Sequence, residues 1–125
     1  MKINVSTGEL VDKVTILAIK SERISDPQKL KNINKEFEIL KSTMEAAGIT
    51  PQSPEYQRLY EINARLWDIE DAIREKEAQK IFDKDFIELA RSVYFNNDER
   101  AAVKREINLR YGSDLVEEKS YTAYS

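Results

Sequence analysis

Hydrophobic residues recur three and four positions apart over most of the chain, which is the spacing of an amphipathic helix. Three long stripes have this period: Leu10, Val14, Leu17 and Ile24; Leu30, Ile33, Phe37, Leu40 and Met44; and Leu59, Ile62, Leu66, Ile69 and Ile73. A shorter stripe contains Phe86, Leu89, Ala90 and Val93. Half-buried strands would show alternation at every second residue instead. The pattern therefore predicts an all-α protein.

The first helix is predicted to begin at Ser6 and to end near Ile24. Ser6 and Glu9 have the spacing of a capping box, in which each side chain bonds to the backbone of the other residue. Beside the main stripe, Ile16 and Ile19 lie on a different side of the helix. A helix that is apolar on two sides packs from two directions, either within a bundle or across a dimer.

The second helix is predicted over residues 27–47 and the third over residues 54–80. Pro27 suits the first turn of a helix, and Gly48 suits the position after its end. Ser53 and Pro54 mark the start of the third helix in the same way. The connectors are short, and short connectors between long helices imply antiparallel neighbours.

Residues 83–111 allow two interpretations. Asp83 is the expected cap of a fourth helix, but the hydrophobic phase breaks at residues 95–98, and a fifth helix would then begin at Asp98. One long, kinked helix is the alternative. The prediction is an antiparallel bundle of four to five helices, followed by a C-terminal strap over residues 113–125.

Composition places the chain in one domain, residues 1–125. It is 34% charged and 41% hydrophobic, with a net charge of −3, which does not favour a nucleic-acid partner. The N-terminus lacks the apolar segment of a signal peptide, and no apolar run is long enough to span a bilayer. We therefore expect a cytoplasmic protein without a membrane or nucleic-acid partner.

The chain has neither cysteine nor histidine, which limits the chemistry it can perform. Disulfides, thiol nucleophiles, thiolate zinc sites and histidine acid–base catalysis are excluded. No glycine-rich phosphate loop is present, and we expect no cofactor and no metal. The sequence assigns no catalytic residues, so whether the protein is an enzyme stays open.

Residues 59–77, LYEINARLWDIEDAIREKE, form the most acidic segment of the predicted third helix. The face opposite its hydrophobic stripe carries Glu61, Asp68, Asp71 and Glu75, and this pattern is typical of a solvated surface. Glu70 and Arg74 border the stripe instead, four residues apart, where they can pair. They are either an ion pair at the rim of the core or part of a ligand site.

Residues 91–110, RSVYFNNDERAAVKREINLR, combine aromatic, amide and basic side chains around the predicted break. An arrangement of this kind can bind a phosphate or a carboxylate. The plainer interpretation is that the amides cap a helix and the aromatic rings fill the bend. The candidate ligand-binding residues are Glu70, Arg74, Tyr94, Asn97, Arg100 and Lys104.

Several long strings of residues resemble a family of small, all-helical bacterial proteins of unknown function. The strings are STGELVDKVTILAIKSERI, LYEINARLWDIEDAIREKE, ELARSVYFNNDERAAVKREIN and LVEEKSY. They cover most of the chain and occur in the same order, whereas the connector around residues 48–54 has no part in the resemblance. The resemblance implies a compact helical domain and carries over no catalytic residues.

Two functional hypotheses follow from these observations. The first is a self-associating or protein-interaction module, and the apolar first helix predicts a homodimer, because large exposed apolar patches are uncommon on monomers. The second is a small helical enzyme, or a binder of an anionic metabolite, that uses arginine, lysine and glutamate side chains. Cationic side chains that converge in one concave pocket would favour the second hypothesis.

Overall fold

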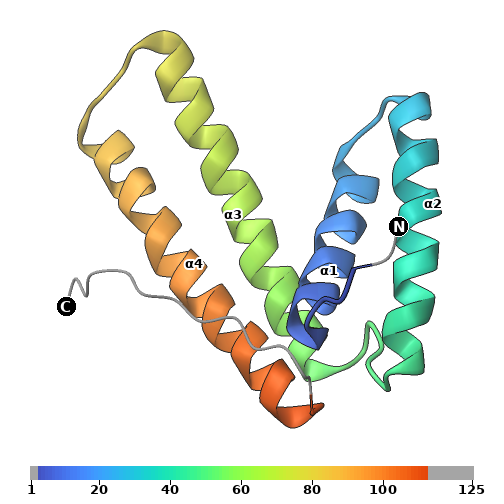
Figure 1. Ribbon diagram of the computed structural model, residues 1–125. Helices are drawn as coiled ribbons and strands as arrows, with labels where there is room; N and C mark the ends of the chain where they lie inside the picture. Colours follow the sequence, from blue (N-terminus) through green and yellow to red (C-terminus); the bar gives the residue numbers. More distant parts are fainter. Residues whose placement is uncertain (1–2, 113–125) are drawn as a thin grey trace.

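Four helices make up residues 3–112, the part of the chain that this computed structural model describes (Figure 1). They are α1 (Thr7–Arg23), α2 (Pro27–Ala46), α3 (Pro54–Gln79) and α4 (Lys84–Arg110). The described residues contain no strand, so the all-α prediction is confirmed, as are the predicted limits of the first three helices to within two residues. The predicted C-terminal strap lies outside the described residues.

Local side-chain chemistry explains where the helices begin. The Ser6 hydroxyl accepts a hydrogen bond from the Glu9 amide at 3.1 Å, which is one half of the predicted capping box. The Glu9 carboxylate binds Lys104 at 2.7 Å, so this side chain joins two helices. Asp26 and Asp83 cap α2 and α4 by accepting backbone amides at 2.9 Å each.

Of the two interpretations of residues 83–111, the structure shows the single long helix, because α4 continues without interruption from Lys84 to Arg110. The Asn96 side chain donates to the Ser92 carbonyl at 2.8 Å, one helical turn away, so this amide is satisfied inside the helix. The hydrophobic phase changes because the neighbours of α4 change. Its first half faces α3, whereas its second half also packs on α1, where Val103 and Ile107 are fully buried.

The helices form two hairpins that diverge from a common base (Figure 1). Helix α1 packs against all three other helices, and α3 packs against α4, whereas α2 has no helix neighbour except α1 in the described part of the chain. The core lies at the base, where the hairpins meet. It consists of Val11, Val14, Met44, Ile49, Tyr56, Leu59, Ile62, Val103 and Ile107.

The distal part of the α3–α4 hairpin projects beyond this core. None of residues 64–102, all of which the structure describes, is buried. The predicted stripe on α3 is therefore divided: Leu59 and Ile62 are buried, whereas Leu66, Ile69 and Ile73 are half-buried. We call residues 66–97 the distal arm. Its apolar surface comes from α3, α4 and the turn between them.

Helix α1 uses its apolar residues within one chain. Val11, Val14, Leu17, Ala18 and Ile19 are all buried, because α2, α3 and α4 pack around this helix. Its apolar character on two sides is therefore explained by its central position in the bundle. Any surface for self-association has to be sought elsewhere.

Candidate functional site

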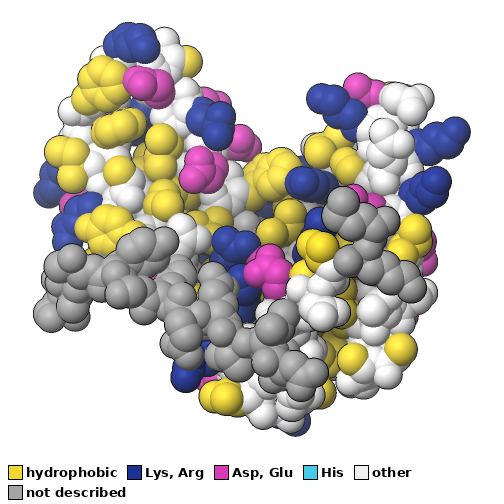
Figure 2. Space-filling model, viewed as in Figure 1, with side chains coloured by type: hydrophobic (Ala, Val, Ile, Leu, Met, Phe, Trp, Pro, Cys, Tyr) yellow, Lys and Arg dark blue, Asp and Glu magenta, His cyan; other side chains and the backbone are white. Residues whose placement is uncertain are grey.

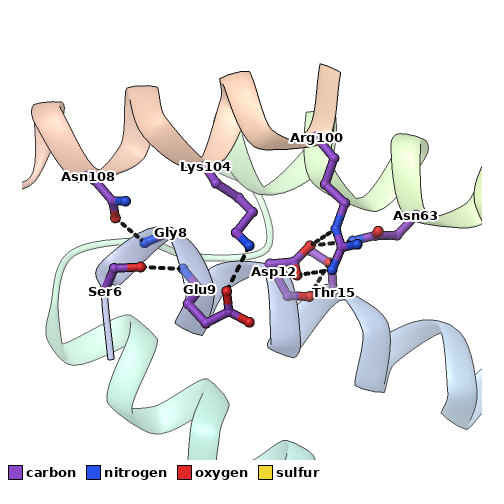
Figure 3. A network of polar contacts seen from close by, with 9 residues as sticks. All are labelled: Ser6, Gly8, Glu9, Asp12, Thr15, Asn63, Arg100, Lys104 and Asn108. Atoms are coloured by element: carbon purple, nitrogen blue, oxygen red, sulfur yellow. Dashed lines mark hydrogen bonds and ion pairs between the residues drawn. The ribbon is translucent and has the colours of Figure 1, made fainter. Parts of the chain in front are cut away.

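A row of polar side chains on α4 faces the N-terminal half of α1 (Figure 3). Arg100, Lys104 and Asn108 are spaced four residues apart, so they lie on one side of α4, one turn after another. Lys104 Nζ binds the Glu9 carboxylate at 2.7 Å, and Asn108 Oδ1 accepts the Gly8 amide at 2.6 Å. These contacts fix α1 antiparallel to α4.

Asp12 is the third acceptor in this row, and its carboxylate is 1% exposed. Arg100 grips it from two nitrogens, with Nε at 2.8 Å from Oδ1 and Nη2 at 2.5 Å from Oδ2. Asn63 of α3 donates to Oδ1 at 2.9 Å and to the Thr15 hydroxyl at 2.9 Å. Side chains from three helices therefore meet at one buried carboxylate, and its charge and acceptor sites are satisfied.

Helices α1 and α4 approach each other closely at Gly8. An added Cβ at Gly8 would lie 2.5 Å from the Lys104 carbonyl oxygen and 3.0 Å from Asn108 Oδ1. Glycine at this position therefore permits the bond between the Gly8 amide and Asn108. The Nδ2 atom of Asn108 is buried without a hydrogen-bond partner among the described residues.

We expect Gly8→Ala to destabilise the protein by about 1–3 kcal/mol, the usual range for forcing extra atoms into a packed interface. The new methyl group would push the two helix backbones apart. Helix propensity alone predicts the opposite sign, a gain of about 1 kcal/mol when glycine becomes alanine inside a helix. Urea unfolding measures the sign directly. A stabilised variant would show that the helices do not need this close approach.

A cleft of about 510 Å³ opens between the two hairpins, directly above the Asp12 cluster. Figure 2 shows the hollow between the hairpins on the face that is drawn. The apolar lining consists of Ile16, Ile19, Leu66 and Trp67. The polar lining consists of Asn63, Glu70, Asp71, Arg74, Asn97 and Arg100.

Four of the six predicted ligand-binding residues line this cleft: Glu70, Arg74, Asn97 and Arg100. The other two lie outside it. Tyr94 is on the exposed surface of α4 and accepts a hydrogen bond from Arg91 Nε at 3.3 Å, and Lys104 is buried beside Glu9. The structure therefore does not bring all six predicted residues into one site.

The charges of the cleft are largely compensated within the described residues. Arg100 is bound to Asp12, and Arg74 lies 3.8 Å from Glu70. Asp71 also lines the cleft, and no ion pair joins it to another described residue. With Asp12 below the floor, three carboxylates face two guanidinium groups. The cleft thus combines an apolar wall with a slightly negative balance of charge.

Two further contacts join α1 to α3 near the wide end of the cleft. Arg23 Nη1 binds the Asp68 carboxylate at 2.5 Å and lies over the ring of Trp67, 6.0 Å from its centroid. The hydrogen bond to Asp68 raises the pKa of Arg23. Tyr60 donates its hydroxyl to Glu22 at 2.5 Å, and this bond raises the pKa of Tyr60 because it stabilises the protonated phenol beside a carboxylate. Each pair is exposed, so its contribution to stability is small.

The acidic face predicted on α3 is exposed, as the sequence pattern indicated. Glu61, Asp68, Asp71 and Glu75 all lie at the surface. Two of them nevertheless have neighbours that periodicity did not identify, since Asp68 binds Arg23 and Asp71 lines the cleft.

The buried cluster around Asp12 was missed by sequence reasoning, although the sequence contains a signal for it. Asp12 lies between Val11 and Val14, on the side of α1 that carries hydrophobic residues, where an unpaired carboxylate would be costly. A partner on another helix is therefore required. The spacing of Arg100, Lys104 and Asn108 on α4 offers suitable partners, but a single sequence does not say which helix faces α1.

Neither a metal centre nor a membrane segment emerges from the described residues. In residues 3–112, carboxylates do not gather in groups of three that could hold a metal ion. The helices over the same residues are too polar or too short in their apolar parts to cross a bilayer. The cleft and the Asp12 cluster are thus the features from which a function has to be argued.

The chain belongs to a family of unknown function (DUF6165), whose model matches residues 1–124. This match confirms the resemblance seen in the sequence strings and covers almost the whole chain. Neither the curated proteins nor the solved structures gave a match. The protein is therefore an all-α member of a family of unknown function, with four helices in its described residues.

Proposed function

We propose that the protein is a self-associating helical module that forms a homodimer through its distal arm. The observation that carries the proposal is the absence of any buried residue over residues 64–102, all of them described, although this stretch contains many large apolar side chains. An amphipathic helix hairpin normally buries its apolar stripe against other elements. A second copy of the arm would provide that cover.

The arm has apolar residues both along its seam and on its outer surface. Ile69 and Ile73 of α3 and Leu89 and Val93 of α4 are half-buried. Outside the seam, Ile87 remains 54% exposed in the first turn of α4. Scattered apolar residues are normal on a surface, but an uncovered seam beside an exposed isoleucine favours an interface.

Charged and aromatic side chains on the arm are suited to the partly solvated rim of an interface. Arg91 lies 3.9 Å from Glu88 and over the ring of Phe95, 5.9 Å from its centroid. Arginine and aromatic residues are enriched in protein interfaces. Two arms side by side would form a four-helix arrangement with a central apolar seam and a charged rim.

The test is the effect of Ile87→Lys on molecular mass, measured by sedimentation equilibrium at micromolar concentration. The wild type is expected at twice the chain mass of 14.5 kDa, and Ile87→Lys at the mass of one chain. Ile39→Lys is the matched control, because Ile39 is 59% exposed in the middle of α2, away from the arm. A lysine at either position stays in water, so both variants should keep the wild-type helix content.

Two outcomes would contradict the proposal. A wild type that sediments as a single chain has no homodimer to disrupt. A wild-type dimer that Ile39→Lys dissociates and Ile87→Lys leaves intact would place the interface on α2 instead.

The second hypothesis, binding of an anionic metabolite, has weaker support from the cleft. Arg100 lines the cleft, but its Nε and Nη2 atoms already bind the Asp12 carboxylate. Arg74 remains, at 3.8 Å from Glu70, but Asp71 lines the same cleft and would repel an anion. We therefore favour self-association.

A further inference from the structure

We propose that the tip of the distal arm, residues 80–84, inserts into the cleft of a second copy, and that the second copy does the same in return. This inference rests on the proposed homodimer and specifies its geometry. It assigns an occupant to the cleft, and it gives the exposed tip a binding partner.

The tip presents two adjacent large hydrophobic side chains at the turn between α3 and α4. Ile81 is 39% exposed and Phe82 is 56% exposed, and the left-handed backbone of Lys80, with φ at 57°, ends α3 just before them. Phe82 meets the edge of Phe86, with ring centroids 5.2 Å apart, which holds its ring at the end of the arm. Large exposed apolar side chains of this kind can anchor an interface by filling a pocket of the partner.

Lysines flank the two hydrophobic residues. Lys80 Nζ lies 3.8 Å from Glu77, a distance at the limit of an ion pair. Lys84 forms no ion pair with another residue of the described range 3–112. Asp83 is already occupied, since it caps α4 and binds Lys76 at 3.1 Å. The tip therefore offers an apolar centre with positive charge on either side.

The cleft has the complementary chemistry. Its wall contains Ile16, Leu66 and Trp67, which can cover the apolar centre of the tip. Glu70 and Asp71 stand on the α3 side of the same cleft, and Asp71 has no ion-pair partner within the described residues. Placing Lys84 of one copy near Asp71 of the other would pair two charges that the single chain leaves apart.

The dimensions of the arm allow both insertions at once. Fourteen residues separate Trp67 in the cleft from Ile81 at the tip, which is about 21 Å at the rise of an α-helix. Two arms lying antiparallel with this overlap place each tip at the cleft of the other copy. A two-fold axis relates the contacts, so the interface closes as a dimer and does not extend into a fibre. The open notch between the hairpins is where such an arm enters (Figure 2).

The absence of cysteine from the chain makes the geometry testable by cross-linking. Two single-cysteine variants, Lys84→Cys and Asp71→Cys, are mixed and treated with a short bis-maleimide reagent. We expect a species of twice the chain mass on a denaturing gel from the mixture, at a yield well above that from either variant alone. Lys35→Cys, on the exposed surface of α2, replaces Lys84→Cys in the control mixture, which should give little product.

Sedimentation of the same mixtures separates the two proposals. If the chains associate and yet cross-link through residues 71 and 84 no better than in the control mixture, that result would contradict the insertion of the tip but not self-association through the arm. Copies that remain single chains overturn both. A charge exchange provides a second measurement: Lys84→Asp should weaken the dimer about tenfold, and adding Asp71→Lys should restore it. A double variant as weak as the single one would contradict the pairing.

Discussion

Replacing Asp12 with alanine is expected to lower the free energy of unfolding by about 3–5 kcal/mol, the usual loss when one partner of a buried ion pair is removed. The Asp12 carboxylate is 1% exposed and binds Arg100 and Asn63. Without it, the Arg100 guanidinium remains between α1 and α4 with its main partner gone. Urea unfolding followed by helix content measures the loss.

Asp68→Ala is the matched control, because Asp68 also binds an arginine across the same pair of hairpins. The Arg23–Asp68 pair is exposed, so its removal should change stability by less than about 1 kcal/mol. Equal losses for the two variants would mean that Asp12 is no more important than a surface charge.

A double replacement separates the charge from the packing. Asp12→Leu combined with Arg100→Met removes the whole ion pair and keeps the volume filled, a change that is often neutral or stabilising at buried pairs. We therefore expect the double variant to regain most of the stability that Asp12→Ala loses. A double variant as unstable as Asp12→Ala would show that the stability depends on the hydrogen bonds to Asn63 and not on the buried charge.

Sequence periodicity predicted the helices well, because three of the four described helices begin with a side-chain cap. Ser6, Asp26 and Asp83 cap helices through their own side chains, so the signal lies within a few residues of the effect. The open choice between one and two helices over residues 83–111 has a different origin. The apolar face of α4 shifts where α1 becomes a second neighbour, and periodicity alone does not distinguish a new neighbour from a helix end.

The candidate site was only partly predictable, for a related reason. Sequence periodicity placed Glu70 and Arg74 beside the hydrophobic stripe, because this depends only on their angular positions around one helix. Both residues line the cleft. The partner of Arg100 was not predictable, since Asp12 lies 88 residues away and only the packing of α1 on α4 brings them together. Tyr94 and Lys104 were grouped with Arg100 by sequence distance. Tyr94 faces another side of α4, whereas Lys104 lies on the same side as Arg100, one turn further along, where it binds Glu9 and not the cleft.

Truncating Leu59 should lower the free energy of unfolding by about 2–5 kcal/mol, as is usual for buried aliphatic residues. Truncating Ile69, ten residues further along the same predicted stripe, should cost about 1 kcal/mol, because partial burial recovers only part of the transfer free energy of an isoleucine side chain. Leu59 is fully buried in the core, whereas Ile69 is half-buried in the distal arm.

The two variants should also respond differently to protein concentration. If a second copy covers the arm, association stabilises the folded protein by mass action, and the loss caused by Ile69→Ala should grow as the concentration rises into the range where dimers form. The loss caused by Leu59→Ala should stay constant, because the core lies within one chain. Urea unfolding at two concentrations a hundredfold apart tests this. Losses of equal size for both variants at every concentration would place the arm in a continuous core, and the basis for proposing a dimer there would disappear.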